Sequence, residues 1–177
     1  SAGDALNMEQ QVLQGEAIVI GDGVSTDDII PGRFAHLRSN LPELAKHALE
    51  DRLPEFQQRV KQGTVLVGGW NFGLGSSREH APVVLKMAGV SVILARSVAR
   101  IFYRNAINQG VVVLICDTSG IEDGDRLEVH VADGLVVNHR TGVSVSCGQM
   151  PPLMSRILAA GGLVPYIKAH GSLDGDT

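Results

Sequence analysis

The stretch TVLVGGWNFGLGSSREHAPVVLKMAG (residues 64–89) carries the strongest structural signal in this 177-residue chain. It begins with an apolar β-branched run that predicts a buried strand and ends with apolar residues at helical spacing. A glycine-rich turn between them holds Ser76, Ser77 and Arg78. Unpaired N–H groups and the helix dipole point outward where such a turn enters a helix. We therefore expect a carboxylate or phosphate to bind at this turn.

Predicted strands and helices alternate on both sides of the turn. Apolar runs at residues 16–22, 90–95 and 111–116 are typical of buried strands. After residue 125 the pattern changes to short strands separated by Asp-Gly and Thr-Gly turns, which indicates antiparallel hairpins. The expected fold is therefore an α/β layer structure with some parallel pairing. Helices are predicted within residues 41–60, 97–110 and 151–162. In the first of these segments a second helix is expected to start at Pro54, and in the second segment Ser97 is the expected N-cap.

The composition is that of an ordinary globular protein. Hydrophobic residues make up 44% of the chain and charged residues 19%, which argues against disorder of the whole chain. The net charge is −4 and the basic residues are dispersed, so nucleic-acid binding is not expected as the main role. No apolar run approaches the length of a membrane span, and no signal-peptide pattern opens the sequence. We expect one domain at 16–168, an N-terminal tail at 1–15 that is partly leftover vector sequence, and a C-terminal tail at 169–177.

The cysteine and histidine positions limit which metals the chain can hold. Cys116 and Cys147 are its two cysteines and lie far apart in sequence. So few cysteines favour a reducing compartment, although a single disulfide is also compatible with them. Two thiolates are too few for an iron–sulfur cluster. His36, His47 and His80 show no metal-ligand spacing. We expect no metal bound by this chain alone.

Ser76 has a structural and a functional interpretation. Ser76 and Glu79 have the spacing of a capping box, which is common and needs no function. Pro82 would then lie past the first turn, where it removes a helix hydrogen bond. The helix could instead begin near His80 or Ala81, which would leave the serines and the arginine in the turn. The spacing alone leaves both interpretations open.

Two other motifs fit this turn less well. Gly73 and Gly75 supply part of a nucleotide-phosphate loop, but Arg78 stands at the third glycine position. A nucleophile elbow of a serine hydrolase would need glycine where Glu79 stands, and His80 lies too close in sequence to act as its base. Both alternatives are therefore weaker than an anion site.

A second polar cluster precedes the turn, within a glycine- and aspartate-rich loop at 23–40. Its sequence STDD at 25–28 is typical of an Asx turn and lacks the spacing of a calcium loop. Long loops in compact domains tend to be functional. In the predicted helix at 97–110, Arg100, Arg104 and Asn105 indicate a solvated face, with a packing or substrate-facing role as the alternative.

Three segments together resemble one known family. GDGVSTDDIIPGRF, NFGLGSSREHA and ARIFYRNAINQG, in this order and spacing, are similar to the small subunit of 3-isopropylmalate dehydratase. That subunit corresponds to the swivelling domain of the aconitase superfamily. The resemblance covers residues 16–166 and implies an α/β fold of the swivelling β/β/α type. Such a domain has a mixed β-sheet core flanked by helices, with a short antiparallel section.

The resemblance implies roles for residues at the turn and in the loop before it. Ser76 matches the family's catalytic base, which takes a proton from a substrate carbon as an alkoxide. Ser77 and Arg78 match residues that bind a substrate carboxylate. Asp27 matches an active-site aspartate of the same domain. A helix start and the adjacent arginine would lower the cost of forming the alkoxide.

The resemblance also identifies a loop that selects the substrate. In the family this loop typically reads Tyr-Leu-Arg-Thr, whereas here it reads His36-Leu37-Arg38-Ser39. Leu37 is expected to pack on an apolar substituent of the substrate, and Arg38 to hold a second carboxylate or to seal the site. The changes at 36 and 39 bear on which substrate is preferred.

The family's activity implies a partner and a cofactor outside this chain. The reaction isomerises 2-isopropylmalate and 3-isopropylmalate by dehydration and rehydration in leucine biosynthesis, in the cytoplasm. Its 4Fe–4S cluster is expected on a large subunit, in a heterodimer or heterotetramer, so this chain should be inactive alone. Alternatives are the small subunit of homoaconitase, citraconate hydratase or dimethylmalate dehydratase, or a non-catalytic anion-binding module. The expected ligand is a small dicarboxylate or hydroxy-diacid.

Overall fold

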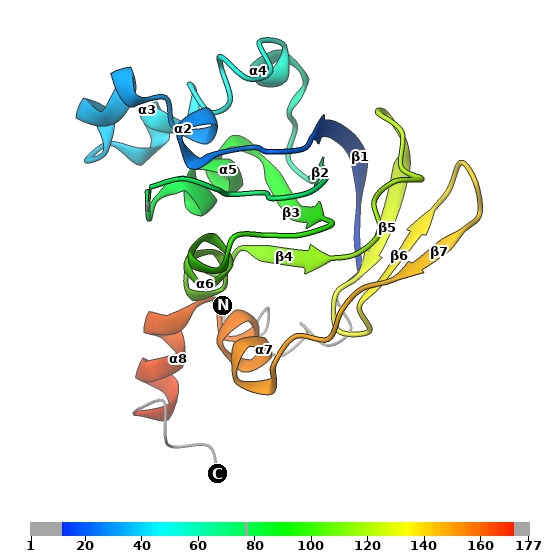
Figure 1. Cartoon of the computed structure of the whole chain (residues 1–177). Helices are drawn as coiled ribbons and strands as arrows, with labels where there is room; N and C mark the ends of the chain where they lie inside the picture. The colour runs from blue at the N-terminus through cyan, green and yellow to red at the C-terminus, as the bar shows by residue number, and fades with distance from the viewer. Residues whose placement is uncertain (1–11, 77, 172–177) are drawn as a thin grey trace.

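A computed structural model describes residues 12–76 and 78–171 and forms a seven-stranded mixed sheet (Figure 1). The strands lie in the order β4-β3-β2-β1-β5-β6-β7. A parallel half contains β2, β3 and β4, and an antiparallel half contains β5, β6 and β7. The strands are β1 (Val12–Gly21), β2 (Thr64–Gly68), β3 (Val90–Ala95), β4 (Val112–Ile115), β5 (Arg126–His130), β6 (Leu135–Asn138) and β7 (Ser144–Ser146).

Strand β1 joins the two halves of the sheet. Its residues 12–16 pair antiparallel with β5, and its residues 17–21 pair parallel with β2. Every residue of β2 is buried, as expected for a central parallel strand covered on both faces. Burial alternates along β5, as expected for an antiparallel strand with one exposed face. The apolar run at 64–68 and the hairpin pattern after 125 are thus confirmed.

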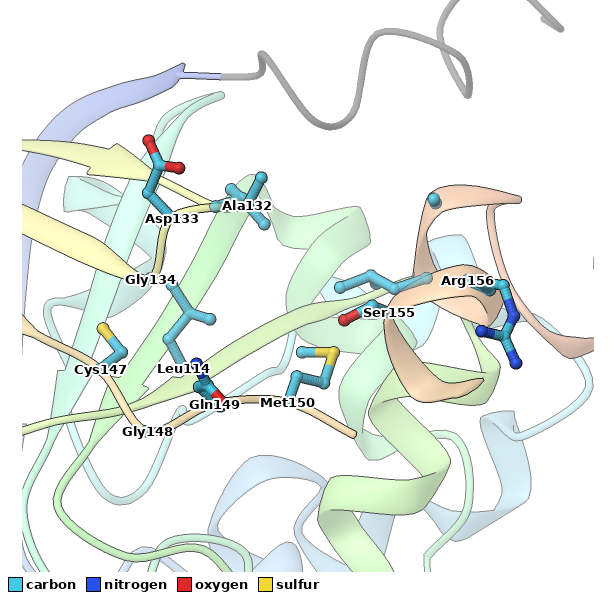
Figure 2. Close-up of a pocket in the computed structure, with 13 residues that line it drawn as sticks. Leu114, Ala132, Asp133, Gly134, Cys147, Gly148, Gln149, Met150, Ser155 and Arg156 are labelled. Atoms are coloured by element: carbon cyan, nitrogen blue, oxygen red, sulfur yellow. The ribbon is translucent and has the colours of Figure 1, made fainter. Parts of the chain in front are cut away.

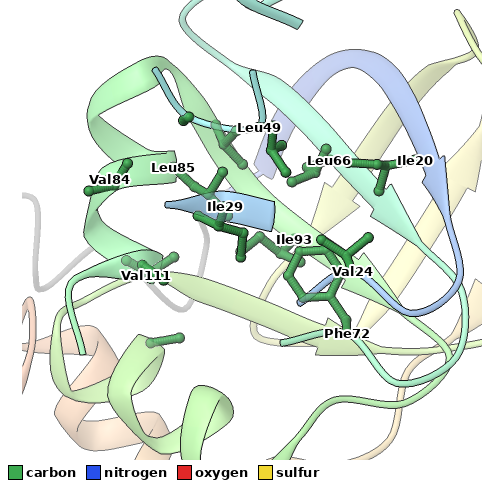
Figure 3. Packing of buried hydrophobic residues seen from close by; sticks show 14 of the residues in the cluster. Ile20, Val24, Ile29, Leu49, Leu66, Phe72, Val84, Leu85, Ile93 and Val111 are labelled. Atoms are coloured by element: carbon green, nitrogen blue, oxygen red, sulfur yellow. The ribbon is translucent and has the colours of Figure 1, made fainter. Parts of the chain in front are cut away.

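Helices cover the sheet, and two hydrophobic clusters fill the space on its two faces. In the first cluster Leu66 and Ile93 pack under α5 (Figure 3). Val65 and Val92 point to the other face, where they pack with residues of α7 and α8. Neighbouring residues of a strand reach opposite faces because side chains alternate along it. The helices are α2 (Thr26–Ile29), η2 (Gly32–Leu37, 3₁₀), α3 (Leu41–Ala45), α4 (Phe56–Arg59), α5 (Ala81–Ala88), α6 (Arg100–Asn108), α7 (Pro152–Ala159) and α8 (Leu163–His170).

Some elements differ from the sequence predictions. The segment 41–60 forms two helices as predicted, but α3 ends at Ala45 and α4 begins at Phe56, later than Pro54. Helix α6 begins after Ala99, so Ser97 is not its N-cap; the Ser97 hydroxyl instead accepts a hydrogen bond from the Asn71 N–H at 2.7 Å. Helix α8 was not expected from the sequence. The domain limits at 16 and 168 stay a prediction, since β1 and α8 continue past them.

No helix within residues 12–76 and 78–171 is both long enough and apolar enough to span a membrane.

Candidate functional site

The glycine-rich turn leaves β2 and runs beside the loop that precedes α2. The Gly73 N–H donates to the Val24 carbonyl at 2.7 Å, and the Thr26 N–H donates to the Leu74 carbonyl at 2.8 Å. The Thr26 hydroxyl donates to the Ser76 carbonyl at 2.7 Å. These bonds bring two segments about fifty residues apart in sequence into contact. The STDD cluster and the serine-arginine turn therefore belong to one site.

Glycine is required where the turn approaches α6 most closely. Gly73 has a φ of +83°, and a Cβ there would overlap the ring of Phe102 on α6. Phe72 beside it is fully buried and meets the Phe102 ring edge-on, with ring centroids 5.4 Å apart. A left-handed backbone and this close approach both exclude a side chain. The aromatic pair thus anchors the base of the turn in the core.

The residue at which α5 starts decides between the capping-box and the turn interpretation of Ser76. The helix begins at Ala81 with His80 as its N-cap, and the His80 side chain makes no capping hydrogen bond. The capping-box interpretation of Ser76 and Glu79 is therefore wrong, and the turn interpretation is confirmed. The Arg78 N–H donates to the Ser76 carbonyl at 2.8 Å within this turn. Ser77, predicted to bind a carboxylate, lies outside the described residues.

A capping box does occur, at the STDD cluster. The Ser25 hydroxyl accepts from the Asp28 N–H, and the Asp28 carboxylate accepts from the Ser25 N–H, both at 2.9 Å. This corrects the expected Asx turn, because the two side chains close the start of α2 reciprocally. Asp27 takes no part in the box and is free to face the turn.

Asp27 and Arg78 form an ion pair across the two segments. Arg78 Nη2 lies 3.0 Å from Asp27 Oδ1. Asp27 is 66% exposed, whereas Arg78 is 27% exposed. Among the described residues, Arg78 Nε is the one buried side-chain nitrogen or oxygen without a hydrogen-bond partner. Leaving such a donor unpaired costs about 1–3 kcal/mol. The guanidinium therefore retains capacity to bind another acceptor.

Two cavities flank Arg78. The first, about 260 Å³, is lined by Ser76 and Arg78 and also by Arg100 and Asn105 of α6. The solvated-face prediction is confirmed for Arg100 and Arg104, which are exposed, whereas Asn105 is half-buried at the wall of this cavity. Exposed Ile101 lies on the same wall, four residues before Asn105 and so on the same helix face. The spacing of Ile101 and Asn105 is the sequence signal that could have indicated that this face of α6 lines a cavity.

The second cavity, about 200 Å³, lies toward the predicted substrate-selecting loop. Arg38 lines it together with Arg78, which agrees with the expected position of Arg38 beside the site. Leu37 lines neither of these two cavities and instead packs against the first hydrophobic cluster. The apolar wall of the cavity comes from residues that the sequence analysis did not single out: Ile30, Ala35 and Leu44.

The histidines of this region do not gather into a metal site. His36 lies within hydrogen-bond distance of the Arg33 carbonyl, at 3.1 Å, and His47 stacks on Phe34 with ring centroids 4.1 Å apart. Over the described residues, no three His, Cys, Asp or Glu side chains are grouped so that they could hold a metal ion.

A larger cavity of about 590 Å³ lies on another part of the molecule, between α7, the turn that joins β5 to β6 and the segment that follows β7 (Figure 2). Half-buried Cys147 lines it, and Cys116 is buried close by. Both are free thiols. Interaction with Cys147 and burial raise the pKa of Cys116, whereas the hydrogen bond from Cys116 lowers the pKa of Cys147. None of the predicted site residues lines this cavity, so it carries no part of the predicted chemistry.

Comparison with known proteins gives consistent matches along the chain. Residues 24–118 match the family model of the aconitase C-terminal domain. The 3-isopropylmalate dehydratase small subunit 2 of Archaeoglobus fulgidus is 55% identical, over 91% of this chain and 98% of its own length. Small subunit 1 of Thermotoga maritima is 48% identical, with the same coverage of both chains. A crystal structure of 3-isopropylmalate dehydratase from Methanocaldococcus jannaschii superposes with a TM-score of 0.86 at 42% identity, over 91% of this chain and 96% of that one.

Proposed function

The chain belongs to the family of 3-isopropylmalate dehydratase small subunits, and on this basis we propose that Ser76, Asp27 and Arg78 are its contribution to the active site. Its fold is that of the aconitase swivelling domain. It functions as the small subunit of a hydro-lyase that interconverts 2-isopropylmalate and 3-isopropylmalate in leucine biosynthesis. The observation that carries the residue assignment is that the segment of Asp27 lies against the turn of Ser76 and Arg78, with an Asp27–Arg78 ion pair and two cavities beside it.

Arg78 binds a carboxylate of the substrate. Its guanidinium has one contact to Asp27 and a buried Nε without a partner among the described residues. A planar fork of N–H donors matches a carboxylate in a two-point geometry. Asp27 is largely exposed, so it can move aside or share the guanidinium when the substrate enters. Arg78 thereby orients the diacid with respect to Ser76.

Ser76 takes the proton from the substrate carbon. An isolated serine hydroxyl is far too weak an acid to supply an alkoxide at neutral pH. At this turn the arginine charge and the N-terminal end of α5 both favour a negative oxygen. Once the substrate is bound, water is displaced from the cavity, which strengthens these interactions. Arg100 and Asn105 on the opposite wall are placed to contact the same ligand.

The cavity lined by Arg38 receives the alkyl arm of the substrate. Ile30, Ala35 and Leu44 form an apolar wall there, next to the charged groups of Arg38 and Arg78. An apolar wall with a few convergent polar groups is typical of a small-molecule site. Substrate contacts of Leu37 and Ser77 remain part of the proposal on the strength of the family resemblance alone.

The iron–sulfur cluster is assigned to the large subunit. This chain has two cysteines, and its described residues hold no group suited to a metal. Its own side chains therefore do not fit a 4Fe–4S cluster, which is held by cysteine thiolates. Departure of hydroxide needs a Lewis acid, and that part of the reaction belongs to the partner. The steps assigned to this chain are binding of a carboxylate and transfer of a proton.

A related hydro-lyase is the second candidate. His36 and Ser39 stand where the family typically has Tyr and Thr, in the loop beside the Arg38 cavity. Substitutions in this loop would affect which alkyl substituent is accepted. Homoaconitase acts on a hydroxy-triacid, whereas citraconate hydratase and dimethylmalate dehydratase act on diacids of different shape, so a substrate panel distinguishes them.

The test is reconstitution of the complex. The chain is mixed anaerobically with a 3-isopropylmalate dehydratase large subunit, and formation of the alkene is followed by ultraviolet absorbance. 3-Isopropylmalate is compared with citramalate, homoisocitrate and 2,3-dimethylmalate, and each subunit alone is the control. We expect turnover by the mixture only, with 3-isopropylmalate as the best substrate. A mixture that assembles but dehydrates none of the diacids would contradict the proposal, and a different best substrate would favour the second candidate.

A further inference from the structure

A side chain at the end of α6 bonds the start of α5. If α5 continued further back along the chain, the Val83 N–H would bond the Glu79 carbonyl, four residues earlier. Here the Val83 N–H donates to Gln109 Oε1 at 3.1 Å, and Gln109 Nε2 donates to the Glu79 carbonyl. The carboxamide of Gln109 is thus inserted between two groups that would otherwise bond to each other.

The neighbouring positions show that Pro82 and Gln109 act together where the helix begins. The Ala81 N–H reaches only three residues back, to the Arg78 carbonyl at 3.0 Å, and Pro82 has no N–H. The first regular helix bond runs from the Val84 N–H to the His80 carbonyl at 3.0 Å. Pro82 prevents the helix from continuing back through Arg78, because its ring would meet the Arg78 carbonyl. Gln109 keeps the residue after Arg78 off the helical path.

Gln109 is itself held firmly in place. It is the C-cap of α6, and its N–H bonds the Asn105 and Ala106 carbonyls at 3.0 and 3.1 Å. Helices α5 and α6 lie side by side (Figure 1). The other end of α6 lines the cavity beside Ser76 through Arg100 and Asn105. Helix α6 therefore lines the cavity and, through Gln109, also contacts the turn that lines the same cavity.

We propose that Gln109 is a positioning residue of the active site: its carboxamide holds the Ser76–Arg78 turn out of α5 and so directs both side chains at the substrate. This inference rests on the proposed function of Ser76 and Arg78. A carboxamide is needed because one atom must donate and another must accept. Methionine has similar length but does neither, and an ionised glutamate has no donor.

The first experiment compares Gln109→Met with Gln57→Met in the complex reconstituted with the large subunit. Gln57 is a matched control, since its half-buried carboxamide also bonds backbone carbonyls, those of Ala45 and Ala48 at 3.1 and 2.9 Å. We expect Gln109→Met to lower kcat/KM for 3-isopropylmalate by about 10- to 100-fold, because small displacements of reacting groups are costly. Gln57→Met should stay within about threefold of the wild type, with a comparable loss of Tm. Equal losses of kcat/KM in the two variants, or none in Gln109→Met, would overturn the proposal.

The second experiment uses Gln109→Glu and does not depend on the methionine variant folding. At about pH 8 the carboxylate repels the Glu79 carbonyl, so activity should be low. As the pH is lowered toward about 4.5, close to the ordinary pKa of a glutamate of about 4.3, the carboxyl group gains a proton and can donate again. We expect the kcat/KM of this variant, as a fraction of the wild-type value at the same pH, to rise several-fold. A fraction independent of pH would contradict the role of the donor.

Failure of the proposed role of Gln109 can be distinguished from failure of the proposed role of Ser76. If Ser76→Ala retains activity, the assignment of the base is wrong whatever Gln109 does. If Ser76→Ala is inactive while both Gln109 variants resemble the wild type, the base assignment stands and the positioning role of Gln109 is wrong.

Discussion

The two halves of the sheet each carry an Asp–Arg ion pair, and the pairs differ in how many of their polar atoms are hydrogen-bonded. In the parallel half, Arg78 meets Asp27 through one contact, and its Nε has no partner among the described residues. In the antiparallel half, Asp125 is 3% exposed and accepts hydrogen bonds from Arg140, from Asn138 and from the Glu122 N–H. The first pair has bonding capacity left for a ligand, and the second has nearly none.

This difference separates a functional from a structural use of the same residue types. The saturated pair holds the turn before β5 to the residues that follow β6. Arg140 and these hydrogen bonds keep the pKa of Asp125 at about 2. The unsaturated pair leaves a buried donor without an acceptor, which costs free energy unless a ligand supplies one. We infer that substitutions in the first pair affect catalysis and those in the second affect stability.

Arg78→Lys should give the largest effect among the tests of this comparison. Lysine keeps the charge but loses the planar fork, so we expect kcat/KM in the reconstituted complex to fall at least about 100-fold. The Tm of the chain should change little, because the exposed partner Asp27 contributes little stability. Steady-state kinetics and thermal melting measure the two quantities. Unchanged KM and kcat would argue against contact with a carboxylate.

Asp125→Asn should show the reverse pattern. Loss of the buried charge leaves Arg140 without its closest acceptor, so the free energy of unfolding should fall by about 1–3 kcal/mol. At a temperature where the variant is folded, kcat/KM should stay within about twofold of the wild type. Urea denaturation measures the first quantity. A variant that loses activity without losing stability would break the comparison.

The Asp125 carboxyl group also makes the stability of the chain depend on pH. The folded-state pKa of Asp125, about 2, lies below the unfolded value of about 3.9. Its stabilisation is therefore fully present above pH 4 and is lost as the pH falls through about 2. Between about pH 4 and 2, the wild type should lose its stability advantage over Asp125→Asn. An advantage that stays constant over this range would contradict the assignment.

The double substitution His36→Tyr and Ser39→Thr should give the smallest effect. It restores the typical family sequence in the loop beside the Arg38 cavity. We expect the ratio of kcat/KM for 3-isopropylmalate to that for citramalate to rise by a few-fold, the range that one or two apolar groups provide. An unchanged ratio would remove the loop from the account of specificity.

The local parts of this structure could be predicted from sequence. The buried run at 64–68, the glycine-rich turn and the position of Pro82 are local signals, and each gave a correct prediction. Likewise, Asp-Gly and Thr-Gly turns indicated the antiparallel half. The family resemblance selected Ser76 and Asp27, and the structure brings the segments that carry them together.

The remaining features depend on contacts between distant segments. Gln109 has no local signature, because its two partners, Val83 of α5 and Glu79 of the turn before it, lie about thirty residues earlier. Asn105 resembles part of a solvated face until α6 is packed beside the turn. Helix α8 is short, and its sequence ends in polar residues that suggested only a tail. Ser97 has the sequence of an N-cap, but its hydroxyl is used by Asn71.

The most direct test of the central claim follows the proton that Ser76 is proposed to remove. 3-Isopropylmalate deuterated at the carbon that loses its hydrogen is incubated with the reconstituted complex, and deuterium in the substrate is measured by mass spectrometry. The account predicts that the wild type releases deuterium to solvent while Ser76→Ala, equally stable and equally assembled, retains it. Release by Ser76→Ala at the wild-type rate would show that another group is the base.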